Sequence, residues 1–203
     1  MKNPLVLLAL TAAGLYVAKL WRDDMRSAQR GRPNANALPG ASPASGLAIL
    51  IATIGALIIV AIETAGEVAL GLFAEQSKMT WAAALYSILG AAVIEEMIFR
   101  GWIVVEKRGR AALWAGIVGA SVVFALIHPF LWEWEDQGFQ LTLTAKGAFS
   151  TVMVFAASLW FYAARFGPWN PQRSLLPCFV AHAAKNAGVV AVKAATGYMG
   201  ALW

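Results

Sequence analysis

The chain has 203 residues, of which 60% are hydrophobic and only 13% charged, with a formal net charge of +5. A soluble domain cannot bury so much apolar surface, whereas a lipid bilayer solvates it, so the composition favours an integral membrane protein. The basic residues form no stripe interleaved with aromatic residues, which argues against a nucleic-acid partner. The single cysteine, Cys178, excludes an intrachain disulfide and a multi-cysteine zinc site.

Six apolar segments follow one another along the chain, each near or above the ~17 residues that a transmembrane helix requires. They comprise residues 4–20, 47–73, 81–105, 111–132, 148–164 and 175–195. The sequence therefore predicts an all-α fold, a polytopic transmembrane helix bundle of about six spans. The first segment is interpreted as an uncleaved helix and not as a signal peptide, because no small-x-small cleavage site follows it.

Basic residues concentrate in alternate loops. The first, third and fifth loops contain Lys19, Arg22, Arg26, Arg30, Arg32, Lys107, Arg108, Arg110, Arg165 and Arg173; the opposite side contains Lys2, Lys78, Lys146 and Lys193, with Glu133, Glu135 and Asp136 in the fourth loop. The positive-inside rule then places both termini outside. We expect a bacterial plasma membrane, since a short single-domain chain with an orderly charge bias suits one.

The segment between the first two predicted helices is rich in Pro, Asn, Ala, Gly and Ser, a composition typical of a flexible linker. We therefore divide the chain into residues 1–46, the first transmembrane helix plus a flexible cytoplasmic linker, and residues 47–203, a five-helix membrane-embedded body.

Polar residues inside apolar segments need an explanation, because each costs several kcal/mol in hydrocarbon unless it is paired or hydrated. These residues are Glu63, Glu67, Glu95, Glu96, Arg100, His128, His182, Lys185 and Asn186. Glu96 and Arg100 lie one helical turn apart and can form an ion pair that fixes helix packing. Glu95 points about 100° away, and packing alone does not explain this second carboxylate.

The other two polar sites lie on separate predicted helices. His128 precedes Pro129, which frees a backbone carbonyl one turn earlier and can open a wet pocket. His182 and Asn186 share one helix face. Each site alone is explained by packing or by interhelical hydrogen bonding, but three such sites on three helices favour a common function.

Together these sites resemble the CAAX prenyl protease and bacteriocin-processing family of intramembrane glutamate proteases, also called the abortive-infection family. That family is recognised by Glu-Glu-x-x-x-Arg, Phe-x-x-x-His and His-x-x-x-Asn or Asp, in this order on separate helices. The corresponding residues here are Glu95, Glu96, Arg100, Phe124, His128, His182 and Asn186. The resemblance implies an endopeptidase that uses glutamate-activated water on a membrane-associated, prenylated or leader-peptide substrate.

Peptide hydrolysis needs an activated water, a stabilised oxyanion and a proton donor for the leaving amine. We expect Glu95 to be the general base, Glu96 to be held ionised by Arg100, and His128 to position the water. His182 and Asn186 would face the oxyanion, a role that the resemblance also implies. Phe99 and Phe124 are assigned to the substrate pocket. A wet cleft is expected among the third, fourth and sixth helices.

Depth in the membrane tests the role of His128. At 1.5 Å per residue, Glu95 lies about 15 Å from the inner surface and His128 about 26 Å. We therefore expect the fourth helix to begin at the interface and to enter hydrocarbon near Ala115. A separation of half a membrane thickness between His128 and Glu95 would rule out the catalytic role of His128.

Several alternatives stay open. No cofactor is expected, although two carboxylates and two histidines could bind zinc. Cys178 lies one turn before His182 and could form a nucleophile pair with it. A proton- or ion-coupled carrier could use Glu63, Glu67, Glu95, His128 and His182 as a relay. A non-catalytic immunity or scaffold protein of the same fold is the third possibility, and the oligomeric state is open.

Overall fold

The structure, a computed structural model, describes residues 3–106, 108–135 and 138–203. Lys2, Lys107 and Asp136, which belong to the charge pattern above, lie outside the described residues. The elements are α1 (Pro4–Gln29), α2 (Gly46–Ala69), η1 (Phe73–Glu75), α3 (Trp81–Leu85), η2 (Tyr86–Ala91), α4 (Ala92–Glu96), η3 (Met97–Trp102), α5 (Arg110–Ile127), β1 (Trp132–Glu135), β2 (Gly138–Leu141), α6 (Ala145–Phe166) and α7 (Leu176–Ala195). The predicted helical bundle is thus confirmed, with one small hairpin added.

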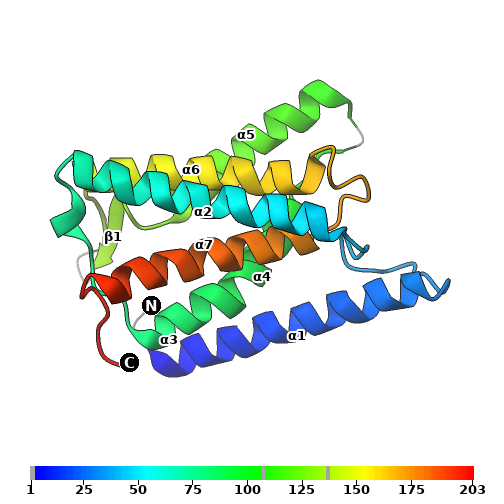
Figure 1. The fold of residues 1–203 in the computed structure, drawn as a ribbon, viewed down its shortest axis with the longest axis horizontal. Helices are drawn as coiled ribbons and strands as arrows, with labels where there is room; N and C mark the ends of the chain where they lie inside the picture. The colour runs from blue at the N-terminus through cyan, green and yellow to red at the C-terminus, as the bar shows by residue number, and fades with distance from the viewer. Residues whose placement is uncertain (1–2, 107, 136–137) are drawn as a thin grey trace.

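Among the described residues, five helical segments are long and apolar enough to cross a membrane: α1, α2, the continuous helix from α3 to η3, α5 and α6. The sixth long helix, α7, is more polar because it carries His182, Lys185, Asn186 and Lys193. It packs against α2, α4 and α6 and lies between them in the bundle (Figure 1). The most polar helix is therefore surrounded by apolar ones, as expected where polar groups face a bundle interior.

Consecutive helices run in opposite directions along the bundle (Figure 1). The end of α1, the start of α2, the end of α6 and the start of α7 lie at one end, which is also the end of the basic loops. The hairpin and the chain's carboxyl terminus lie at the other end, where Met79 pairs with Met199. The orientation of the bundle in a membrane remains a prediction.

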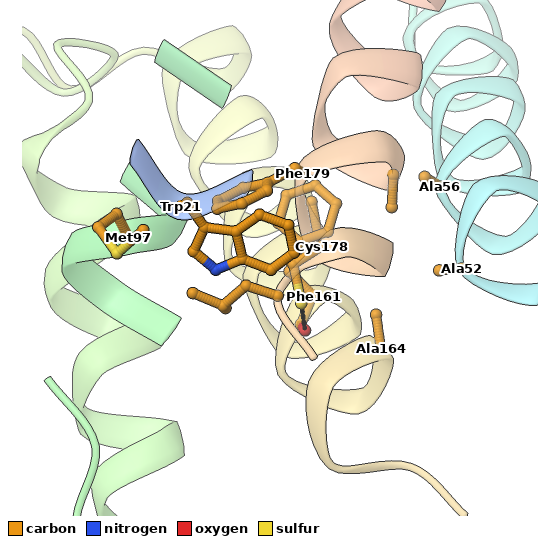
Figure 2. Packing of buried hydrophobic residues seen from close by; sticks show 11 residues of the cluster. Trp21, Ala52, Ala56, Met97, Phe161, Ala164, Cys178 and Phe179 are labelled. Carbon is orange, nitrogen blue, oxygen red and sulfur yellow. Dashed lines mark hydrogen bonds between the residues drawn. The ribbon is translucent and has the colours of Figure 1, made fainter. Parts of the chain in front are cut away.

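The main apolar core joins α1 to the body of the protein (Figure 2). Trp21 of α1 lies edge-on to Phe179 of α7, with ring centroids 5.3 Å apart, and shares a buried cluster with Met97 and Phe161. Alanines of α2 and α6 complete this cluster and let the helices approach closely. The first helix is thus an integral part of the packed bundle.

Hydrogen bonds also tie down the segment between α1 and α2. Leu38 N donates to Asp24 Oδ2 (2.9 Å), Trp21 Nε1 donates to Pro39 O (3.1 Å), and Leu175 N donates to Gly40 O (3.1 Å). Pro39 and Gly40 form a turn here that contacts the rest of the protein. The division of the chain at residue 46 remains a prediction.

Two glycines set the distance between α1 and the third helix. A Cβ atom added at Gly14 would lie 2.6 Å from Gly90 Cα and 2.8 Å from Gly90 O. Any side chain at Gly14 therefore meets backbone, which cannot rotate away. The close approach is of the kind that small residues permit between membrane helices.

The fourth predicted helix ends earlier than the sequence pattern indicates. We expected it to continue to Trp132, but α5 ends at Ile127 and His128 is extended, with ψ at 129°. The cause is Pro129, because a proline disfavours helical backbone in the preceding residue. Figure 1 also shows α5 inclined to α6, with its amino-terminal end apart from the bundle; where it enters a bilayer stays a prediction.

Candidate active site

Two widened turns flank the paired glutamates. The helix from Trp81 to Trp102 is α-helical at Ala92–Glu96 and π-helical before and after it, in η2 and η3. Such π-helical turns are rare and are often found at functional sites, because they rotate the following side chains relative to a regular helix. They place Glu95 and Glu96 on a short α-helical segment in the middle of this helix.

Glu96 and Arg100 form an ion pair with no solvent exposure. Arg100 Nη1 donates to Glu96 Oε1 at 3.0 Å, and both side chains are 0% exposed. Arg100 Nη2 donates to Ser158 O of α6 (2.9 Å), and Ser158 Oγ donates to Ser121 Oγ of α5 (2.9 Å). The ion pair therefore joins three helices. The sequence did not predict Ser158 as a partner of Arg100, nor Ser121, which looks like a packing residue, as a partner of Ser158.

Aromatic rings enclose the Arg100 guanidinium. Its carbon lies 4.6 Å from the Phe124 centroid, 4.8 Å from that of Tyr162 and 5.3 Å from that of Phe161. Phe99 packs edge-on against Phe124 at 5.0 Å. Phe99 and Phe124 are thus buried in this aromatic shell, and their assignment to a substrate pocket stays a prediction.

His182 is held between the two glutamates. Its Nδ1 lies 2.8 Å from Glu96 Oε1 and its Nε2 lies 3.8 Å from Glu95 Oε2. A carboxylate that is paired with Arg100 accepts hydrogen bonds, so His182 Nδ1 is the donor and Nε2 faces Glu95. The ring stacks on Phe161, with centroids 4.8 Å apart and an interplanar angle of 17°. These contacts fix the direction in which Nε2 points.

Glu95 differs from Glu96 in its surroundings. Its side chain is 26% exposed, and its nearest described ionic partner is His182 Nε2 at 3.8 Å. That separation exceeds hydrogen-bonding distance, so each group keeps its capacity to bind a third one. Glu95 is therefore accessible to solvent, and its carboxylate lies next to the imidazole of His182 on α7.

His128 and Asn186 complete the predicted set. His128 Nδ1 lies 2.7 Å from Phe124 O; because a carbonyl only accepts, Nδ1 is the donor and Nε2 is left for another partner. The Phe124 ring lies 4.8 Å from the His128 ring and 6.3 Å from that of His182. Asn186 Nδ2 donates to Ser87 O of η2 at 2.7 Å. The structure thus brings the third, fourth and sixth helices together around these side chains.

Two alternatives can be compared with this geometry. Cys178 is fully buried and its Sγ donates to Phe161 O at 3.3 Å, so the thiol is directed to α6 and not to His182 (Figure 2). In the part of the chain that the structure describes, no three His, Cys, Asp or Glu side chains are grouped so as to hold a metal ion.

The region that contains this site matches a known family. Residues 76–188 match the family model described as Type II CAAX prenyl endopeptidase Rce1-like. The chain belongs to this family. It is therefore a membrane-embedded protease of the CAAX type with a membrane-associated substrate. The match covers more than half of the chain, including all predicted site residues, and excludes α1, the linker and α2.

No curated protein and no solved structure matches the chain significantly.

In this Rce1-like chain a cavity of about 370 Å³, lined by apolar and charged side chains, lies next to the site, between α2, α6 and α7. Pro129 and Lys185, which are adjacent in sequence to His128 and Asn186, are part of its wall. We expected a wet cleft among the third, fourth and sixth helices, but the third helix does not line this cavity. Glu63 lies 3.5 Å from Lys185, and Glu67 forms an ion pair with Lys146. The sequence singled out Glu63 and Glu67 as polar residues in an apolar segment, but it did not predict that Lys185 and Lys146 pair with them.

Proposed function

We propose that the protein is an intramembrane endopeptidase in which Glu95 activates the water that cleaves a membrane-associated substrate, either prenylated or carrying a leader peptide. The observation that supports this proposal is the arrangement of Glu95 and His182. An accessible carboxylate lies 3.8 Å from an imidazole nitrogen, and that imidazole is oriented by a second, fully buried carboxylate. A helix-packing role requires only the buried carboxylate.

In the proposed reaction Glu95 accepts a proton from water as the water oxygen attacks the peptide carbonyl carbon. The carbonyl oxygen becomes negatively charged in the tetrahedral intermediate. The proton then passes from Glu95 to the leaving amine as the carbon–nitrogen bond breaks. This sequence releases one carboxylic acid, which then ionises in water, and one amine, and it leaves Glu95 ready for another cycle.

The remaining residues would orient the reactants and stabilise charge. His128 Nε2 is available to orient the water, because Nδ1 is occupied by Phe124 O. His182 Nε2, when it carries a proton, can donate to the oxyanion from the position that Glu96 fixes. Asn186 donates one amide hydrogen to Ser87 O and keeps a second one for the oxyanion.

The decisive experiment compares wild type with Glu95→Gln, which removes the base and keeps the side-chain shape. The substrates are membrane-tethered peptides, with and without a prenyl group, and the readout is kcat/KM for peptide cleavage. We expect a loss of about 10²–10⁴-fold, the usual contribution of a general base. Glu133→Gln, an exposed carboxylate in β1, is the matched control and should cleave like wild type.

Equal cleavage by wild type and Glu95→Gln would contradict the glutamate mechanism. Cleavage by neither would instead favour the non-catalytic scaffold.

A further inference from the structure

The cavity between α2, α6 and α7 combines apolar walls with buried charge. Its volume of about 370 Å³ falls within the usual range of small-ligand sites. Valines form much of its apolar wall: Val60, Val154, Val189 and Val192. It adjoins the candidate active site through Lys185, which lies on α7 between His182 and Asn186. A ligand in this cavity would therefore lie beside the catalytic groups.

The cavity wall contains three carboxylates and three lysines, and one of the lysines has no ionic partner among the described residues. Glu63 pairs with Lys185, and Glu67 pairs with Lys146. Lys193 is half-buried and donates to two neutral oxygens, Ser77 O (2.7 Å) and Gln76 Oε1 (3.3 Å); within the described residues it forms no ion pair. Glu75, the third carboxylate of the wall, is exposed, so water screens its charge. The interior therefore suits a ligand with one negative charge.

The position of Lys193 on α7 gives the length of that ligand. Asn186 and Lys193 are seven residues apart, which places them on the same helix face with a rise of about 10 Å. An extended peptide of three residues also spans about 10 Å. The Lys193 ammonium is held at the far end of this span by Ser77 O and Gln76 Oε1.

We propose that this cavity holds the substrate's carboxyl-terminal side and that Lys193 binds its terminal α-carboxylate. The inference rests on the proposed function. A CAAX motif ends the chain, with the prenylated cysteine followed by two aliphatic residues and one further residue. Any cut within it releases at most three residues that end in a free carboxylate. The valine walls suit the aliphatic side chains of the motif, and Lys193 supplies a positive charge for the terminal carboxylate.

The test uses the purified full-length protein and one prenylated, membrane-tethered peptide in two forms, ending in a free carboxylate or in a carboxamide. Wild type should cleave the carboxylate form with a kcat/KM at least about tenfold higher, since a charge-assisted hydrogen bond is lost in the amide. In Lys193→Gln the ratio of the two values should fall to about one. Lys193→Arg should keep the preference.

The matched control is Lys78→Gln, which removes an exposed lysine at the same end of the bundle and outside the cavity wall. It should keep the wild-type ratio. A wild type without preference, or an unchanged preference in Lys193→Gln, would overturn the role of Lys193 while leaving the protease function intact. Failure of wild type to cleave either form would overturn the proposed function itself, and this inference with it.

Discussion

Neighbouring residues in this site have different surroundings because a helix turns by about 100° per residue. Glu96 points into the bundle, where Arg100 and His182 occupy its Oε1 atom and no water reaches it. Glu95 points to the edge of the same cluster and stays 26% exposed. The buried glutamate is thus suited to hold the histidine, and the accessible one to exchange protons.

Replacing Arg100 by Gln should strongly destabilise the protein. The substitution leaves Glu96 buried without its cation, and losing one partner of a buried ion pair costs about 3–5 kcal/mol. The thermal unfolding midpoint in detergent should fall clearly. Arg173→Gln is the control, because Arg173 pairs with Glu106 at the surface, where such a pair contributes about 0–1 kcal/mol. Similar midpoints for the two variants would contradict the structural role of Arg100.

At the scale of elements, the third helix is positioned by its neighbours. On one side Gly14 of α1 contacts the backbone of Gly90 in η2. On the other side, Asn186 Nδ2 of α7 donates to the carbonyl oxygen of Ser87, which also lies in η2. Glu95 and Glu96 belong to α4, which follows η2 directly along the chain. The spacing of α1, η2 and α7 therefore sets where the two carboxylates lie.

Gly14→Ala should therefore lower stability even though alanine is the better helix former. The new methyl group would lie 2.6 Å from Gly90 Cα, and such overpacking costs typically 1–3 kcal/mol. Gly119→Ala in α5 is the control, since nothing lies within 4 Å of its added Cβ; it should be neutral or stabilising by up to about 1 kcal/mol. Thermal unfolding measures both. A stabilised Gly14→Ala would show that α1 and η2 separate easily.

Across the whole molecule, two ion pairs lie between the site and the hairpin end of the bundle, Glu63–Lys185 and Glu67–Lys146. A relay in a carrier needs groups that change protonation or partner, whereas these carboxylates are each already paired with a lysine. The arrangement favours a charged wall beside a protease site over an ion path.

Proteoliposomes that contain wild type should therefore show no proton flux above protein-free vesicles. An internal pH-sensitive dye measures the flux under an imposed potential. The same preparation is first tested for peptide cleavage, which shows that the protein is folded. A flux that Glu63→Gln abolishes would favour the carrier.

Much of the fold could be predicted because it depends on local sequence. Long apolar segments specify membrane helices wherever they pack, and an i,i+4 spacing predicts the contact between Glu96 and Arg100 from helix geometry alone. The hairpin at Trp132–Glu135 and Gly138–Leu141 was missed. Pro129 carried a local signal that the preceding helix ends, but the predicted segment ran past it.

Local sequence patterns were enough to predict the membrane bundle, the alternation of charged loops and the motifs on three helices. The partners that meet across helices became known from the fold alone: Lys146 with Glu67, Lys185 with Glu63, Ser158 with Arg100, and His182 with Glu96. Helix geometry relates residues that are only a few positions apart. The rotation and spacing of packed helices relate residues up to 122 positions apart, as for Glu63 and Lys185, and they arise from the sum of many side-chain contacts.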